Sequence, residues 1–297
     1  MIAPDKPLSG LSILLAEDVE INRTILISLL QDAGAKVTGV VNGQDASRAI
    51  TPPRAYDFVL MDLHMPVMDG LEATISIRSQ DDPDCATIPI IILSADPDPE
   101  QKAALREAGV NGLLAKPMEL EALASLLREV LPERPEDGPS ASDTARHAAT
   151  TMDRAPQASA PVTPVPSTPT AAASGSSSGA EIDLKKLSDY AGLFGPEGLG
   201  DLVTLFATQG PDLAGEIAQA MGDPANSAAA DLDAAISAAH KLASAAGSLG
   251  LVELETRCRA FEAAPDNDLL VDITRLVGDS LAGLQAFLAG LDPEERL

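Results

Sequence analysis

The first 131 residues alternate short apolar runs with segments of helical periodicity, and this alternation restricts the fold more than any other feature. The runs that we expect to form strands span 12–16, 36–41, 58–61, 90–93 and 113–115. Helical spacing of apolar residues follows each run, over 21–33, 44–50, 71–79, 99–108 and 119–130. Gly34 and Gly109 are expected to end two of these helices in left-handed conformations. Five β-α units predict a parallel sheet covered by helices on both faces.

An abrupt change of composition divides the chain. Ala, Pro, Ser, Thr and Gly fill 36 of the 49 positions from 132 to 180, and Ile, Leu and Phe are absent there. Such a segment buries too little apolar surface to offset the entropy lost on ordering. We therefore expect a disordered linker between a domain at 8–131 and a second domain at 181–297.

The second domain lacks strand-like alternation. Helical patterns cover 182–190, 196–221, 224–249, 251–263 and 267–289, separated by Gly, Pro and Asp-Asn breaks. Long helices with short turns predict an up-down bundle of the four-helix type. The fold class is thus α/β plus all-α.

Charge and composition exclude several classes of partner. The chain has 297 residues, a formal net charge of −25 and only 2% aromatic residues, and acidic side chains outnumber basic ones in both domains. Nucleic acids and anionic membrane surfaces would repel such a protein. Cys85 and Cys258 are too few for a disulfide framework, and no apolar run is long enough for a membrane span or signal peptide. We expect a cytoplasmic protein.

Polar residues gather where the predicted strands end. Because parallel strands share one carboxyl edge, Glu17, Asp18 and Asp62 should converge there, with Ser94 and Lys116 beside them. Each residue alone is more typical of a solvated loop, but all five lie at the same end of consecutive β-α units. Three like charges favour a divalent cation held by oxygen ligands, with Mg²⁺ first. A hydroxyl, an ammonium and a metal fit a phosphoryl-transfer site.

The segment that carries these residues resembles the receiver domain of two-component response regulators. The resemblance covers 11–131 and rests on ILLAED at 13–18, DFVLMDLHMPVMDG at 57–70, IIILSA at 90–95 and LLAKP at 113–117. It implies a flavodoxin-like (βα)5 fold and a phosphoacceptor aspartate. The resemblance implies that Asp62 is the phosphoacceptor and that Ser94 and Lys116 contact the phosphoryl group. It also implies a cis Lys116-Pro117 bond. The implied Mg²⁺ ligands are Glu17, Asp18, Asp62 and the backbone carbonyl of His64.

One position departs from the receiver pattern. Receivers that switch an output surface usually carry Tyr or Phe three residues before the lysine, where this chain has Leu113. The departure favours a domain that carries phosphate over one that drives a conformational output.

His240 is the single histidine of the second domain. Leu232, Ile236, Ala239, Ala243 and Ala246 follow helical spacing and are expected to face the core. The adjoining face, with Asp233, Ser237, Ser244, Ser248 and nearby Gly247, is small and polar. His240 is then either an ordinary exposed histidine or, given an aspartyl acceptor in the same chain, a phosphoryl acceptor.

The segment 239–254 (AHKLASAAGSLGLVEL), with Cys258, Phe261 and Glu262 after it, looks like a histidine phosphotransfer (HPt) domain over about 182–291. That family usually carries Lys-Gly where this chain has Ala243 and Ser244. The missing lysine removes a cation, and Lys241 points elsewhere on the helix. An unphosphorylated bundle therefore stays an alternative.

These features predict a phosphorelay protein. It would accept a phosphoryl group on Asp62 from a histidine kinase or hybrid kinase, relay it between Asp62 and His240, and pass it to another receiver or HPt protein. No phosphate-binding loop of the Gly-x-x-x-x-Gly-Lys-Ser/Thr type is present, so we do not expect an ATP-using kinase. The alternatives are a receiver that regulates a docking bundle and a phosphate sink with an inert bundle.

Overall fold

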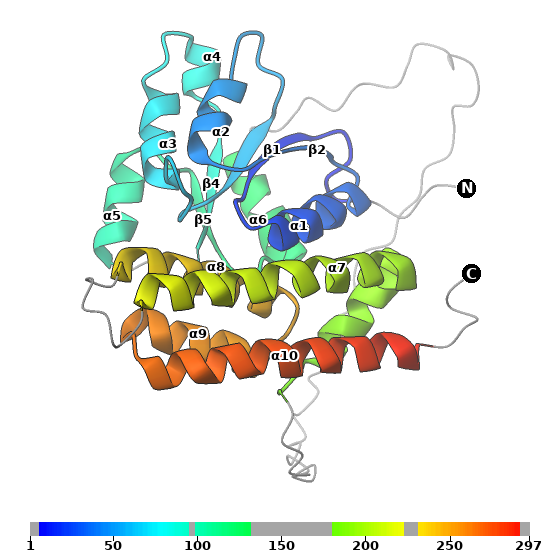
Figure 1. The fold of residues 1–297 in the computed structure, drawn as a ribbon. Coiled ribbons are helices and arrows are strands. Elements are labelled where there is room, and N and C mark those ends of the chain that lie inside the picture. Colours follow the sequence, from blue (N-terminus) through cyan, green and yellow to red (C-terminus); the bar gives the residue numbers. More distant parts are fainter. Residues whose placement is uncertain (1–5, 95–98, 132–179, 223–230, 292–297) are drawn as a thin grey trace, which may run out of the picture. The chain divides into compact units, whose positions relative to one another are not determined.

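A computed structural model describes residues 6–94, 99–131, 180–222 and 231–291 of the chain (Figure 1). These residues form an α/β part that ends at Leu131 and an all-helical part that starts at Ala180. The expected linker at 132–180 lies outside the described residues, apart from Ala180.

The α/β part has the expected parallel sheet, with strand order β2-β1-β3-β4-β5. Its strands are β1 (Ser12–Ala16), β2 (Lys36–Val40), β3 (Phe58–Asp62), β4 (Ile90–Ser94) and β5 (Gly112–Ala115). Its helices are α1 (Glu20–Asp32), α2 (Gly43–Ala49), α3 (Gly70–Arg78), α4 (Pro83–Ala86), α5 (Pro99–Glu107) and α6 (Leu120–Val130). Gly34 and Gly109 have φ of 99° and 91°, which confirms both left-handed helix ends.

The short helix α4 was not predicted from the sequence. It is a single turn, too short to show an apolar period, and it starts at Pro83 after the Asp82 side chain accepts a hydrogen bond from the backbone of Cys85.

Alternate residues of the central strands face two separate cores. Helices α1 and α6 cover one face, where Leu30 and Leu127 pack with residues such as Leu15. Helices α2, α3 and α5 cover the other face, where Ile77 and other side chains pack. Both faces of the strands are buried, which explains why these strands read as continuous apolar runs.

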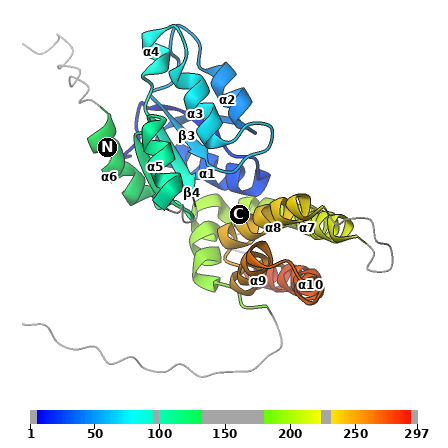
Figure 2. The same cartoon turned by 90° about the vertical axis from the view of Figure 1, so that its left-hand side faces the viewer.

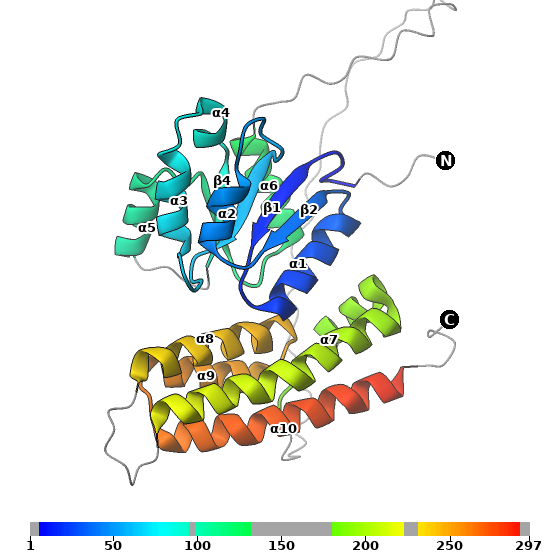
Figure 3. The same ribbon diagram turned by 45° about the horizontal axis from the view of Figure 1, so that its top comes forward.

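The all-helical part consists of α7 (Leu184–Met221), α8 (Leu232–Ser248), α9 (Val252–Ala263) and α10 (Asn267–Gly290). Helix α7 packs with α8 and α10, and α9 packs with the same two helices, so the four close a ring (Figures 2 and 3). Gly195, with φ of 70°, interrupts α7 where the sequence predicted two separate helices. Within the described ranges, no helix is both long and apolar enough to cross a membrane.

The start of the histidine-bearing helix differs from expectation. Residues 224–230 of the expected 224–249 helix lie outside the described residues, and α8 begins at Leu232. Leu232, which was expected in the core, lies in the first turn of α8 and is 47% exposed among the described residues. Ala239, Ala243 and Ala246 are buried as expected.

Gly70 holds the start of α3 against the end of β3. Its backbone N–H donates to the carbonyl of Leu63, at 2.8 Å. A Cβ at this position would lie 2.6 Å from the backbone oxygen of Asp62, so no larger residue fits without moving the strand end. The Asp69 side chain caps the same helix through a reciprocal capping box with Glu72.

We expect Gly70→Ala to destabilise the α/β part by about 1–3 kcal/mol, because the methyl group overpacks against rigid backbone. The matched control is Gly278→Ala in α10, where an added Cβ meets nothing within 4 Å. That change should be neutral or stabilise by up to about 1 kcal/mol through helix propensity. Calorimetric unfolding of both variants measures the effects, and equal effects would contradict the close approach at Gly70.

Candidate functional site

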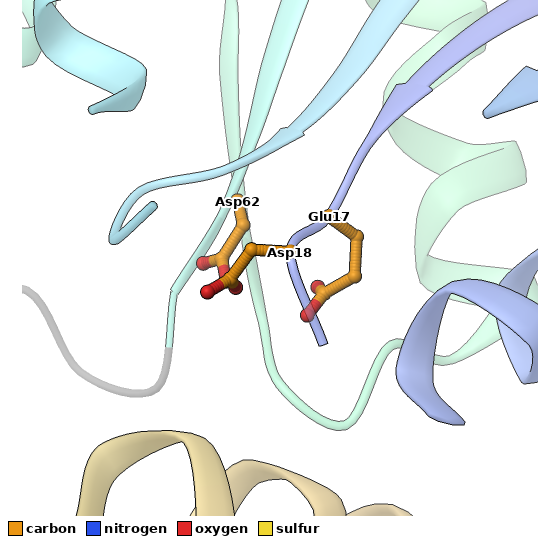
Figure 4. A group of neighbouring side chains, drawn as sticks. All are labelled: Glu17, Asp18 and Asp62. Carbon is orange, nitrogen blue, oxygen red and sulfur yellow. The ribbon is translucent and has the colours of Figure 1, made fainter. Parts of the chain in front are cut away.

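Three carboxylates meet at the carboxyl edge of the sheet. Glu17 and Asp18 directly follow β1, and Asp62 ends the neighbouring strand β3. The strands pair in register up to Ala16 and Met61, so the next residues of each come out at the same level. Ligand atoms from all three side chains lie within 4.8 Å of one another (Figure 4). The convergence expected from the sequence is therefore present.

Lys116 joins two of these carboxylates. It follows β5, and its Nζ donates to Oε2 of Glu17 at 2.8 Å and to Oδ2 of Asp62 at 2.7 Å. Burial by itself would lower the pKa of Lys116, but the two carboxylates outweigh it and raise that pKa above its ordinary value. The ammonium is therefore a permanent positive charge in this cluster. The Lys116-Pro117 bond is cis, as the resemblance implied.

The cluster keeps an excess of negative charge that suits a metal ion. Burial raises the pKa of Glu17 to about 7, against the opposing effect of Lys116, and burial also raises the pKa of Asp18. Both shifts show that charging these groups is costly here. Among the described residues of the α/β part, the ammonium of Lys116 faces all three carboxylates, and a divalent cation would balance further negative charge. The donors are oxygen atoms only, which is the set that Mg²⁺ prefers.

Ser94 and His64 lie beside the cluster. Ser94 is buried and ends β4, whose preceding residue Leu93 pairs with Asp62. The backbone N–H of His64 donates to Oδ1 of Asp62 at 3.4 Å, a long hydrogen bond, while the His64 side chain is exposed. The roles of the Ser94 hydroxyl and the His64 carbonyl stay predictions.

Two residues of α1 that the sequence analysis did not single out hold the acidic loop. Asn22 donates to Oε1 of Glu17 at 3.0 Å, and Arg23 donates to the backbone oxygens of Glu17 and Asp18 at 2.9 and 3.3 Å. The first turn of the helix thus folds back over the loop that precedes it. The sequence signal was only that both residues follow the carboxylates by about one helical turn.

A second site surrounds His240 on α8, facing α9. The Nδ1 atom of His240 lies 3.0 Å from Oε2 of Glu262. Arg259, one turn earlier on α9, donates to Oε1 of Glu262 at 3.1 Å, and its Nη1 atom lies 3.3 Å from the same His240 nitrogen. All three side chains are partly buried. The sequence analysis gave no role to Arg259 and none to Glu262 beyond its place in the motif.

These contacts indicate which ring nitrogen of His240 is protonated. A carboxylate at 3.0 Å accepts only if Nδ1 carries the proton. Arg259 always donates, and its N–H groups already bond to Glu262, so it does not need a lone pair on Nδ1. In the neutral ring with Nδ1–H donating to Glu262, Nε2 keeps its lone pair.

Family models match both parts of the chain. Residues 13–128 match the response regulator receiver domain, and residues 201–289 match the Hpt domain. The acidic edge of the sheet lies in the first match, and the His240 network lies in the second.

Several curated relatives and solved structures are similar to parts of the chain. The sensory/regulatory protein RpfC of Xanthomonas campestris is 36% identical over 121 residues, which are 41% of this chain and 16% of RpfC. The aerobic respiration control sensor protein ArcB of Escherichia coli is 27% identical over 255 residues, 84% of this chain and 27% of ArcB. Among solved structures, the chain is similar to the receiver domain of sensor histidine kinase PA1611 from Pseudomonas aeruginosa, which was crystallised with magnesium in its active site cleft. The two are 36% identical, and the match covers 41% of this chain and 98% of that one, with a TM-score of 0.37.

The order of the two matches agrees with the order of the two sites. The chain spans only part of the length of these curated relatives, 16% of RpfC and 27% of ArcB. The chain thus carries a response regulator receiver domain followed by an Hpt domain.

Proposed function

We propose that this protein is a phosphorelay intermediate that carries a phosphoryl group on Asp62 and on His240. The observation that supports the proposal is that one chain holds an aspartate in a carboxylate–ammonium cluster and a histidine bonded to a carboxylate. Asp62 lies among two further carboxylates and the Lys116 ammonium. His240 has one ring nitrogen held by Glu262 and the other left as a nucleophile.

The receiver half would supply an aspartyl acceptor. A carboxylate oxygen of Asp62 attacks the phosphorus of a donor phosphohistidine, so that a P–O bond forms as the P–N bond breaks and the donor imidazole leaves. Lys116 is positioned to pair with a phosphoryl oxygen, and Ser94 would donate its hydroxyl to another. Glu17, Asp18 and Asp62 would hold Mg²⁺, with the His64 carbonyl as a further ligand. When bound, the ion would neutralise negative charge on the phosphoryl oxygens.

The Hpt half would supply the second acceptor. The Nε2 atom of His240 would take the phosphoryl group from Asp62. As the P–N bond forms, the P–O bond breaks and the Asp62 carboxylate returns to its free form. The Nδ1 proton stays in its hydrogen bond to Glu262 throughout. The reverse step uses the same groups, so the residues permit flow in either direction.

The proposed partners follow from the two matched domains. A histidine kinase or hybrid kinase would supply the phosphoryl group, because receiver and Hpt domains carry such a group but do not take it from ATP. A further receiver or Hpt protein would take the group onward. The net charge of −25 argues against nucleic-acid and anionic membrane partners.

Asp62→Asn should abolish labelling of the chain through its receiver, including labelling of His240 that depends on Asp62. His240→Gln should leave Asp62 labelling intact and block export to a downstream receiver. Transfer profiling against candidate kinases and receivers, with acid and base treatment to separate the two phosphoryl linkages, measures both effects.

The matched controls are Asp32→Asn, at an exposed position at the end of α1, and His147→Gln. Unchanged export from His240→Gln would contradict the relay. A short-lived aspartyl phosphate that never reaches His240 would instead favour the phosphate sink. Absence of phosphohistidine under every donor, with stable Asp62 labelling, would favour the docking bundle.

Mg²⁺ should stabilise the receiver, because a ligand that binds only the folded state adds about 1.4 kcal/mol at ten times its dissociation constant. Asp18→Asn should remove most of this response. Since burial raises the pKa of Asp18, the neutral amide should be at least as stable as the wild type without Mg²⁺. Thermal unfolding with MgCl₂, against NaCl of equal ionic strength, tests both points. A full Mg²⁺ response in Asp18→Asn would contradict the ligand assignment.

A further inference from the structure

Arg259 stands at the junction of three polar side chains on the Hpt surface. Its guanidinium bonds Glu262 at 3.1 Å, lies 3.3 Å from Nδ1 of His240 and approaches Glu255 at 3.9 Å. An arginine on α9 therefore contacts the imidazole that α8 presents, although the two residues are 19 positions apart.

A phosphoryl group on His240 would add negative charge to a site that already holds a carboxylate. A phosphoryl group on Nε2 brings about two negative charges next to a ring already bonded to the Glu262 carboxylate. On α8 itself, the residue one turn after the histidine is Ala243, which is buried and carries no charge. Without a nearby cation, the carboxylate and the phosphoryl group would repel each other.

We propose that Arg259 is the charge partner of phosphorylated His240, supplying from α9 a cation where α8 carries the uncharged Ala243 one turn after the histidine; this inference rests on the proposed function. A guanidinium has five N–H donors in a fixed fork, so one edge can keep the Glu262 bond while another turns to phosphoryl oxygens. In the unphosphorylated state the same residue keeps Glu262 aimed at Nδ1. Arg259 therefore serves both states of the site.

The test labels His240 directly with phosphoramidate in the full chain carrying Asp62→Asn. In this reaction the P–N bond of phosphoramidate breaks, ammonia leaves and a P–N bond forms at Nε2 of His240. Arg259→Gln should slow labelling about three- to tenfold, and Arg259→Lys should keep it within about twofold because the charge is retained. Arg257→Gln, on the same helix but paired with Asp272, is the matched control and should label at the wild-type rate.

Comparison with Glu262→Gln separates a direct role from simple neutralisation of Glu262. The loss caused by Arg259→Gln should persist in the Glu262→Gln background, as a double-mutant cycle measures. Disappearance of the loss there, or wild-type labelling by Arg259→Gln alone, would overturn the role of Arg259 and leave the relay standing. Failure of the parent chain to label at His240 at all, with native circular dichroism, would overturn the histidine step of the relay together with this inference.

Discussion

The ammonium of Lys116 between Glu17 and Asp62 is the interaction on which the receiver site depends. The parallel register of β1 and β3 forces carboxylates together at one edge, at a distance where their repulsion would otherwise be large. Lys116 arrives from β5, on the far side of β4, so the site requires the whole strand order and not one local motif. The contact between Lys116 and the carboxylates therefore depends on the arrangement of the whole sheet.

The two sites manage charge by opposite means. At the sheet edge, negative charge is in excess and the acceptor Asp62 is one member of the cluster. Beside His240, one carboxylate and one guanidinium compensate each other. Under the proposed relay, the carboxylate acceptor would need added cations, whereas the imidazole would need its Nδ1 proton held in place.

The acidic edge was predictable because topology alone places strand ends. Once five β-α units were recognised, Glu17, Asp62 and Lys116 had to converge, and no knowledge of side-chain packing was needed. The Arg259–His240 contact was not predictable, because it depends on how α8 and α9 are rotated against each other. Leu232 was wrongly assigned to the core, because helical periodicity does not show how far the burial of a helix face extends toward its first turn.

The break at Gly195 has a consequence for how the Hpt part is delimited. Before that break, Lys186 and Tyr190 donate to the carbonyls of Gly247 and Ser248, which end the histidine-bearing helix. Residues 181–183 also form backbone hydrogen bonds with residues 250–252, which directly follow this helix end. The family match starts only at residue 201. A fragment that starts at residue 201 would lose these hydrogen bonds to the end of α8. A minimal Hpt fragment that keeps them must begin at residue 181.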